Sequence, residues 1–283
     1  MNGEAGRVAV ITGATSGVGA AVARVLSKAG YSLVLTAPSM EKLSALASQL
    51  RGPCTVIEGN LGNESLPESL LYAALDRFGH CDVCFNNGAL FEAGIIETVD
   101  IERLSSMVRV NVEGSFRVAY VFLKHFVSEG AGHLVNVSSV VGSSSRPTAY
   151  AATQRAIEVL SDALAAELDD SDVLVSCIQP GLVKSGLHHR WEIAPEGAGS
   201  GYPLEPEDFA RMVLFILQQG RARETAEEEI EAPANSDGER LTEIETETGQ
   251  TRESDVAEES EDAAEEGGDD DDRTAEGFIQ DEP

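Results

Sequence analysis

Basic residues are scarce in this chain of 283 residues, which has 20 lysines and arginines against 49 aspartates and glutamates. An acidic chain without a basic stripe is unsuited to nucleic acid, so we expect no nucleic-acid partner. Long apolar runs are also missing, because the longest candidate, Val118 to Val127, contains Lys124 and His125. Since a membrane-spanning helix needs about 20 apolar residues, we expect no membrane span.

Cysteine is rare as well, and four cysteines in a chain of this length do not predict a disulfide scaffold. The start of the chain is short and polar, unlike a secretory signal, so we expect a reduced, soluble, cytoplasmic protein. Cys81 and Cys84 have the spacing of a metal or redox pair. No second pair completes a zinc site, so we expect no bound metal and two buried apolar residues, facing opposite sides of a strand edge.

The acidic excess is concentrated in the last 50 residues. Residues 234–283 contain 20 acidic residues and three arginines, a net charge of −17, and include four consecutive aspartates at 269–272. Such a segment cannot bury enough apolar surface to offset the entropy of ordering it. The sequence therefore predicts one folded domain over residues 1–233 and a disordered acidic tail over 234–283, for which a protein partner is a candidate ligand.

Short apolar runs alternate with helical patterns throughout the predicted domain. The expected strands are 7–12, 31–36, 54–58, 82–85, 133–137 and 173–178. The expected helices are 18–29, 40–50, 66–78, 101–126 with an interruption near Asn111, 150–168 and 208–219. Strands that are apolar on both sides indicate a parallel sheet covered on both faces. We therefore predict an α/β, doubly wound Rossmann fold, which binds ligands at the carboxyl ends of its strands.

A glycine-rich loop, Thr12-Gly13-Ala14-Thr15-Ser16-Gly17-Val18-Gly19, joins the first expected strand to the first expected helix. Glycines let the backbone approach a pyrophosphate closely, and the helix N-terminus offers unpaired N–H groups. A tight turn that needs glycine is the simpler alternative. The strand-loop-helix context is the one that a dinucleotide-binding motif requires.

Other polar groups lie at or near the carboxyl ends of the later strands. In chain order they are Asn86-Asn87-Gly88-Ala89, Asn111, Ser138-Ser139, Tyr150 and Pro180-Gly181-Leu182-Val183-Lys184-Ser185. Any one of them could cap a helix or form a turn. Five such groups at one edge of a sheet predict a functional site there.

Taken together, these motifs resemble those of the short-chain dehydrogenase/reductase family over residues 7 to 220. The glycine loop resembles that family's T-G-x-x-x-G-x-G, and the asparagine run resembles its N-N-A-G with the last two residues exchanged. Asn111-Val112-Glu113-Gly114 resembles its helix asparagine motif. Asn136-Val137-Ser138-Ser139 resembles its N-x-S-S, and residues 180–185 resemble its P-G-x-V-x-T.

The resemblance implies hydride transfer between a nicotinamide and a small carbonyl or alcohol substrate. It makes Tyr150 the proton donor or acceptor, Ser139 the holder of the substrate oxygen, and Asn111 the residue that orders a water in a proton relay. The residues that it implies for cofactor binding are Gly13, Thr15, Ser16, Gly17, Val18, Gly19, Asn60, Leu61, Asn86, Asn87, Pro180, Gly181, Val183 and Ser185.

Gln154 stands where the family has a lysine that binds the nicotinamide ribose and lowers the pKa of the tyrosine. Residues four apart share a helix face, so we expect Gln154 to point where the lysine would and to hydrogen-bond a ribose hydroxyl. A cation about 4 Å from a phenolate is worth roughly 4 kcal/mol at an effective dielectric near 20, or up to ~3 pKa units. Without it Tyr150 is poorly poised as a base. Arg155 lies about 100° around the helix and is not expected to substitute.

Other departures concern the far end of the cofactor. Dinucleotide enzymes place an acid for the ribose 2′-hydroxyl, or an arginine for a 2′-phosphate, at the end of the second strand. The run Thr36-Ala37-Pro38-Ser39 has neither. Lys42 is near enough in sequence to reach a phosphate, which favours NADP over NAD. Asn60 stands where the family has an aspartate that contacts the adenine.

Two more departures affect geometry and assembly. The stretch from Ser139 to Tyr150 is a residue or two shorter than is usual in the family, so we expect an altered separation of the two side chains. The resemblance implies a homodimer or homotetramer. Glu227 to Ala232 is a poor version of the family's last strand, which weakens the case for the tetramer.

Two functions therefore stay open. The first is an NAD(P)(H)-dependent oxidoreductase of weakened activity, favoured by Tyr150, Ser139, Asn111 and the glycine loop. The second is a catalytically degenerate relative, a nucleotide-binding or scaffold protein whose acidic tail recruits a partner. Gln154, Pro38 and Asn60 favour the second.

Overall fold

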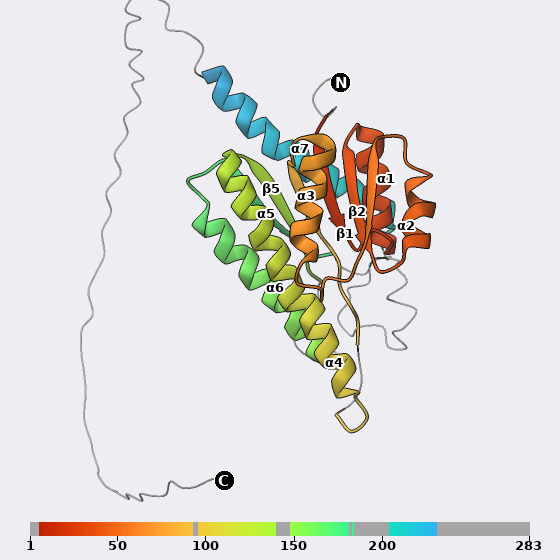
Figure 1. The fold of residues 1–283 in the computed structure, drawn as a ribbon. Coiled ribbons are helices and arrows are strands. Elements are labelled where there is room, and N and C mark those ends of the chain that lie inside the picture. The colour runs from red at the N-terminus through yellow and green to blue at the C-terminus, as the bar shows by residue number, and fades with distance from the viewer. Residues whose placement is uncertain (1–5, 93–95, 140–147, 181–182, 184–203, 231–283) are drawn as a thin grey trace, which may run out of the picture. The chain divides into compact units, whose positions relative to one another are not determined.

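The computed structural model describes residues 6–92, 96–139, 148–180, 183 and 204–230, with the side chains of 148 and 220–230 left out. Its sheet is parallel and has six strands in the order β3-β2-β1-β4-β5-β6 (Figure 1). The strands are β1 (Val8–Thr12), β2 (Ser32–Ala37), β3 (Cys54–Glu58), β4 (Val83–Asn86), β5 (Gly132–Val137) and β6 (Val173–Ile178). This confirms the doubly wound Rossmann fold, with the switch in strand order between β1 and β4.

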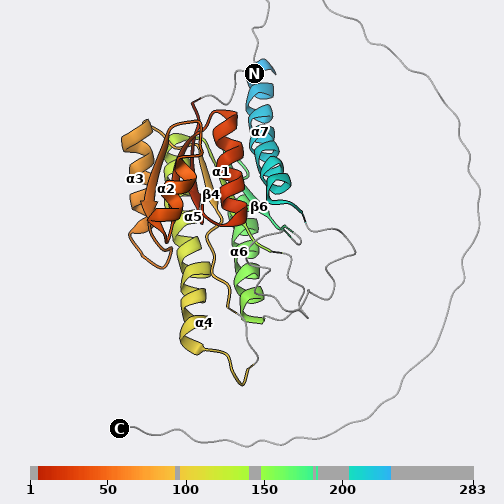
Figure 2. The same cartoon turned by 90° about the vertical axis from the view of Figure 1, so that its right-hand side faces the viewer.

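The chain divides into two units, residues 1–233 and residues 234–283, and the second unit, the predicted tail, lies outside the described residues. In the first unit, helices cover both faces of the sheet (Figure 2). One face carries α1 (Gly17–Ala29), α2 (Met40–Ala47) and α7 (Pro206–Ile230). The other carries α3 (Leu66–Phe78), α5 (Ser115–Glu129) and α6 (Thr148–Glu167). The helix α4 (Ile101–Val108) precedes α5.

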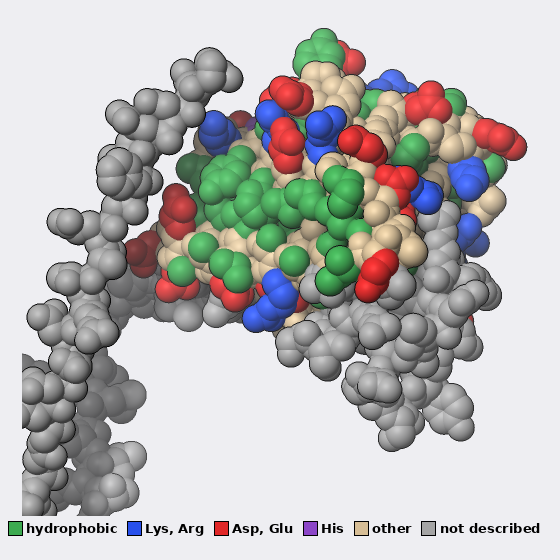
Figure 3. Space-filling view, turned by 90° about the horizontal axis from the view of Figure 1, so that it is seen from below, with side chains coloured by type: hydrophobic (Ala, Val, Ile, Leu, Met, Phe, Trp, Pro, Cys, Tyr) green, Lys and Arg blue, Asp and Glu red, His purple; other side chains and the backbone are tan. Residues whose placement is uncertain are grey.

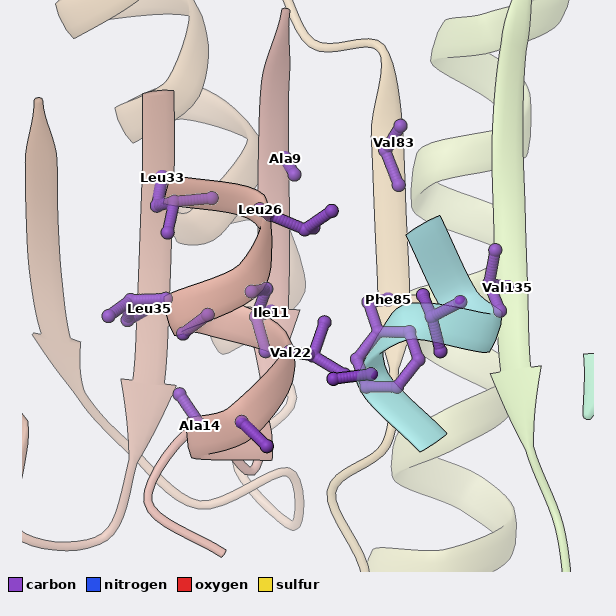
Figure 4. Packing of buried hydrophobic residues seen from close by; sticks show 14 of the residues in the cluster. Ala9, Ile11, Ala14, Val22, Leu26, Leu33, Leu35, Val83, Phe85 and Val135 are labelled. Carbon is purple, nitrogen blue, oxygen red and sulfur yellow. The ribbon is translucent and has the colours of Figure 1, made fainter. Parts of the chain in front are cut away.

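Each strand supplies both apolar layers. In β1, Ala9 and Ile11 face α1 and α7, whereas Val8 and Val10 face the layer of α3 and α5. Figure 4 shows the first layer, in which side chains from β2, β1, β4 and β5 meet those of α1. Because successive side chains of a strand point to opposite faces, burial on both faces explains why the strands are mostly apolar instead of alternating.

The expected long helix from Ile101 is interrupted at the predicted place. A π-helical segment, η1 (Arg109–Gly114), separates α4 from α5 and contains Asn111. A π-helical turn widens the helix locally and is frequent at functional sites. This packing requires glycine at position 114, because a Cβ on Gly114 would lie 2.4 Å from the carbonyl oxygen of Leu61.

Two expectations need correction. The last helix, expected over 208–219, spans Pro206–Ile230, and it includes residues 227–230, the poor match to the family's last strand. Alanine, glutamate and arginine favour this longer helix. Cys81 and Cys84 are buried as predicted, but in the same apolar cluster and not on opposite sides. The strand β4 begins only at Val83, so strand alternation does not reach Cys81. Across the described residues, the helices are too short or too polar to span a membrane.

A buried histidine couples the stability of the sheet to pH. His133 in β5 is 5% exposed, and its Nε2 lies 2.8 Å from the Oγ of Ser176 in β6. Burial, and to a smaller extent the charge of Arg7, lowers the pKa of His133 to about 4. The native protein therefore holds this imidazole in its neutral form at neutral pH.

We predict that His133 reduces the free energy of unfolding as the pH falls from about 6.5 to about 4. In this window the unfolded chain binds a proton on the imidazole and the native state does not, which costs up to about 1.4 kcal/mol per pH unit. Above about pH 6.5 both states are neutral and the effect vanishes. Urea unfolding at several pH values should show a shallower acid-side slope for His133→Asn than for the native chain. Identical slopes would contradict the prediction.

Candidate active site

The glycine loop turns the N-terminus of α1 toward the edge of the sheet. Ser16 caps this helix, because its Oγ accepts a hydrogen bond from the backbone N–H of Gly19 at 3.0 Å. The first turn of α1 has no acidic residue. Since the first amides of a helix have no intrahelical partner, those of Gly17 and Val18 can bind an anion there.

Close backbone approach explains two of the glycines. Gly13 has a φ of +61°, and a Cβ there would lie 2.8 Å from the Cα of Gly88. A Cβ at Gly19 would lie 2.3 Å from the carbonyl oxygen of Gly13. The loop is therefore folded tightly upon itself and against the segment after β4, and side chains at these positions would open it.

The asparagine run after β4 braces this loop. The Oγ1 of Thr12 accepts hydrogen bonds from the backbone N–H groups of Asn87 and Gly88, both at 2.9 Å. The side-chain amide of Asn87 donates to the carbonyl oxygens of Thr12, at 3.1 Å, and Gly13, at 3.3 Å. Two motifs far apart in the sequence thus form one rigid unit.

Asn86 is directed inward and joins the strands and helices under the site. Its Nδ2 donates to the carbonyl oxygen of Ser115 at 3.1 Å and to the Oδ1 of Asn136 at 2.9 Å. The Nδ2 of Asn136 in turn donates to the Oγ of Ser161 at 2.9 Å. All four side chains are buried. In this structure Asn86 positions β4 and β5, and cofactor contact by its side chain stays a prediction.

Tyr150 and Ser139 meet beyond the end of β5. Tyr150 is 6% exposed in the first turn of α6, and a hydrogen bond joins its hydroxyl to the side chain of Ser139. Burial raises the pKa of Tyr150 to about 12, and the bond with Ser139 opposes this rise in part. Residues 140–147 of the connecting stretch lie outside the described residues, and an altered separation of the two side chains stays a prediction.

Phe91 is a member of this cluster that the sequence did not reveal. Its ring packs edge-on against that of Tyr150, with the centroids 5.0 Å apart and the planes at 68°. Aromatic pairs favour this T-shaped arrangement. No sequence signal marks the residue, because an apolar side chain after a strand is ordinary.

Asn111 lies under the cluster and connects its parts. Its Oδ1 accepts from the N–H of Leu90 at 2.7 Å, and its Nδ2 donates to the carbonyl oxygen of Leu90 at 2.9 Å. The same Nδ2 donates to the Oγ1 of Thr153 at 3.1 Å, which donates to the carbonyl oxygen of Tyr150 at 2.7 Å. Asn111 thereby positions the first turn of α6, and its ordering of a water stays a prediction.

Gln154 follows Tyr150 by one helical turn and is 4% exposed. Its backbone carbonyl oxygen lies 3.2 Å from the Oγ of Ser138, whose single proton is directed mainly at the Oε1 of the buried Glu158, at 2.7 Å. The neighbouring Arg155 pairs with Glu158, and its side chain is 70% exposed. Among the described residues, no positive charge contributes to the pKa of Tyr150. Arg155 is thus engaged elsewhere.

At the other end of the edge, β3 supplies an acid, Glu58, that no sequence motif marks. Glu58 pairs with Ala37 in the parallel register of β3 and β2. Its Oε1 accepts a hydrogen bond at 2.8 Å from the N–H of Met40, the first residue of α2. The sequence could have indicated Glu58 in one way: if the second and third strands pair, the acid that ends the third strand lies beside the end of the second.

Some of the remaining residues predicted to bind the cofactor lie within the described part of the structure, and others do not. The Oδ1 of Asn60 accepts from the N–H of Gly62 at 2.9 Å, and Leu61 is buried against the glycines after β4 and in η1. Pro180 follows β6, and the buried Val183 forms a bridge with Leu204. Gly181 and Ser185 lie outside the described residues. Within the described part of the chain, no group of three histidine, cysteine or acidic side chains could hold a metal.

Comparison with known proteins identifies the family to which the chain belongs. The family model described as short chain dehydrogenase matches residues 7–195. An uncharacterized oxidoreductase of Staphylococcus epidermidis is 32% identical over 215 residues, covering 75% of this chain and 91% of the relative. One of Staphylococcus haemolyticus is 31% identical over 217 residues, covering 76% and 92%.

Solved structures agree with these sequence matches. A 3-ketoacyl-(acyl-carrier-protein) reductase from Brucella melitensis, complexed with NADH, matches with a TM-score of 0.69 and 26% identity, covering 76% of this chain and 91% of its own. The actinorhodin polyketide ketoreductase with NADPH matches with a TM-score of 0.66 at the same identity and coverage. With the family model spanning most of the first unit, the chain belongs to the short chain dehydrogenase family.

Proposed function

We propose that this protein is an NAD(P)(H)-dependent oxidoreductase that transfers hydride between a nicotinamide and a small carbonyl or alcohol substrate. The observation that carries the proposal is the meeting of Tyr150 and Ser139 at the sheet edge that also holds the glycine loop. Its structural relatives include reductases solved with NADH and with NADPH. Its four cysteines are free, which supports a reducing, cytoplasmic setting.

The residues present fit a dinucleotide. The cradle formed by Gly13 and Gly19 would be filled by any Cβ, and the N-terminus of α1 has no acid that would repel a pyrophosphate. Gln154 would offer an amide to the nicotinamide ribose. When bound, the nicotinamide supplies or takes up the hydride. The protein supplies the hydroxyl groups of Ser139 and Tyr150, which hold the substrate oxygen and exchange its proton.

The raised pKa favours one direction of this reaction. With a pKa of about 12, Tyr150 is a neutral phenol at physiological pH, so it can donate a proton but rarely accept one. Hydride addition to a carbonyl produces an alkoxide, a stronger base than a phenolate, which a neutral phenol can protonate. Alcohol oxidation needs the phenolate, which burial disfavours. We therefore propose carbonyl reduction as the main direction.

Removal of the phenol hydroxyl tests the proton donor. We expect Tyr150→Phe to lower the rate of carbonyl reduction by about 10²–10⁴-fold without loss of cofactor binding. The rate is followed as oxidation of NADH and NADPH with a panel of carbonyl compounds. Tyr72→Phe, at an exposed position of α3, is the matched control and should leave the rate unchanged. Equal rates for Tyr150→Phe and the native chain would remove Tyr150 from the mechanism.

Restoring a cation tests the role of Gln154. We expect Gln154→Lys to lower the pKa of Tyr150 by up to ~3 units, because a positive charge stabilises the phenolate. Alcohol oxidation by the variant should then level off at a lower pH than oxidation by the native chain. Gln154→Met, without charge, should keep the native pH profile. The explanation fails if the lysine variant also keeps it.

A second function is favoured by the absence of a described cation beside Tyr150. It is a catalytically degenerate nucleotide-binding or scaffold protein whose acidic tail, residues 234–283, recruits a partner. The same experiments separate the two functions. Native protein that binds cofactor but reduces no carbonyl, together with an active Gln154→Lys, would identify the degenerate form.

We also propose that the protein self-associates, as a homodimer or homotetramer. Figure 3 shows apolar side chains gathered on the face of the molecule that is seen from below. Independently of that view, large apolar side chains are exposed on α5 and α6; they include Tyr120, Val127 and Val159, the last of which is 63% exposed. Extended apolar patches on soluble proteins commonly mark interaction surfaces.

A charge placed on α6 tests this assembly. We expect Val159→Glu to lower the molar mass measured by light scattering, because an unpaired carboxylate is costly to bury in an interface. Tyr72→Glu, at a comparably exposed position of α3, is the control and should keep the native mass. A Val159→Glu protein that keeps its native oligomeric mass would exclude this helix face from the interface.

A further inference from the structure

We propose that Glu58 makes this protein select NAD(H) over NADP(H), by placing a carboxylate at the N-terminus of α2. The proposal rests on the proposed function, because it assigns a specificity to the same nucleotide site. It concerns only the adenosine end of that site, and binding measurements test it without any substrate.

A residue that distinguishes NAD from NADP must lie near the end of β2. In a doubly wound sheet the pyrophosphate lies at the N-terminus of the first helix, and the 2′ position of the adenosine ribose reaches the end of the second strand. An acid there accepts a hydrogen bond from the 2′-hydroxyl of NAD, whereas a basic residue accommodates the 2′-phosphate of NADP. The strand β2 ends at Ala37, and Pro38 and Ser39 follow. The strand itself therefore offers neither an acid nor a base.

The neighbouring strand provides the missing charge. Glu58 lies beside Ala37 in the β2–β3 register, and the N–H of Gly59 donates to the carbonyl oxygen of Ala37 at 3.0 Å. From this position the Glu58 carboxylate reaches the start of α2, where it accepts a hydrogen bond from the N–H of Met40 at 2.8 Å. An acid is thus present at the end of β2 in space, although it comes from β3 in sequence.

This contact occupies a place that would otherwise suit a phosphate. The N-terminus of a helix attracts anions through its free amides and its dipole. Glu58 already uses the Met40 amide, and the side chain of Ser39 accepts from the N–H of Lys42 at 3.3 Å. A 2′-phosphate at this helix terminus would meet a carboxylate of its own sign and would find these two amides engaged.

A ribose hydroxyl meets no such obstacle. A carboxylate has two oxygens and can accept several hydrogen bonds. The bond to Met40 uses the Oε1 of Glu58, and its Oε2 can accept from a hydroxyl. The hydrogen bond to an ionised acceptor is stronger than one between neutral groups. Glu58 therefore favours the dinucleotide that has a free 2′-hydroxyl.

Lys42, which favoured NADP on sequence grounds, is outweighed in the structure. It lies in the first turn of α2, where Glu41 is a second acid. No ion pair between Lys42 and Glu58 is present among the described residues, and both side chains are exposed. Two carboxylates and one ammonium thus surround the start of this helix, and their balance repels a phosphate.

Direct binding measurements with the full chain test the proposal. NADH and NADPH are titrated by fluorescence, and ADP and 2′,5′-ADP by calorimetry, so that the adenosine end is also probed alone. We expect the native protein to bind NADH at least about tenfold more tightly than NADPH, and ADP more tightly than 2′,5′-ADP. Equal affinities, or tighter binding of the 2′-phosphorylated ligands, would overturn the proposal.

Two variants of Glu58 isolate the charge. Glu58→Gln keeps an oxygen that can accept from Met40 but removes the charge, so NADPH should bind about tenfold more tightly while NADH changes by less than about threefold. Glu58→Lys should extend the gain for NADPH. Glu68→Gln is the matched control, because it neutralises an acid in the first turn of α3, and it should change neither affinity.

The outcomes separate this proposal from the proposed function. If the native protein binds NADPH as tightly as NADH, or if Glu58→Gln leaves NADPH binding unchanged, the selection by Glu58 is wrong and the oxidoreductase function stands. If no dinucleotide binds to the native chain or to any variant, the proposed function itself fails, and the selection fails with it.

Discussion

The site depends on one close contact, between the backbone of the glycine loop and the segment that follows β4. A Cβ at Gly13 would lie 2.8 Å from the Cα of Gly88, so the backbones approach closely there. The Oγ1 of Thr12 accepts hydrogen bonds from the backbone N–H groups of Asn87 and Gly88. This contact lies at the switch in strand order, where a doubly wound sheet opens a crevice for ligands. It keeps the N-terminus of α1 directed at that crevice.

A second constraint is the low polarity around Tyr150. The phenol is buried and packs against Phe91, and the uncharged Gln154 follows it by one helical turn. Its hydrogen bond with Ser139 offsets burial only in part, so the neutral phenol is the stable form. Electrostatics therefore favour the neutral phenol, which is the form that the proposed role as a proton donor requires.

Charge is distributed unequally along the sheet edge. The α1 end has no acid in its first turn and suits a pyrophosphate, whereas the start of α2 carries the Glu58 carboxylate on its first amide. Two helix N-termini of the same sheet thus differ in what they can bind, and the difference comes from one side chain of β3. Asn111 adds order at the Tyr150 end of the same edge, because the π-helical segment places its amide between Leu90 and Thr153.

The sequence by itself determined the fold and most of the candidate site. Short apolar runs that alternate with helical patterns indicate a sheet covered on both faces. A glycine motif is defined by a few neighbouring residues, so both features can be recognised locally in the sequence. Only the tertiary structure decided which side chains meet. The pairing of Tyr150 with Ser139, the packing of Phe91, the inward direction of Asn86 and the reach of Glu58 to α2 each join residues from different elements. Such contacts depend on strand order, register and helix packing, which arise from the whole chain at once and leave no mark at either residue alone.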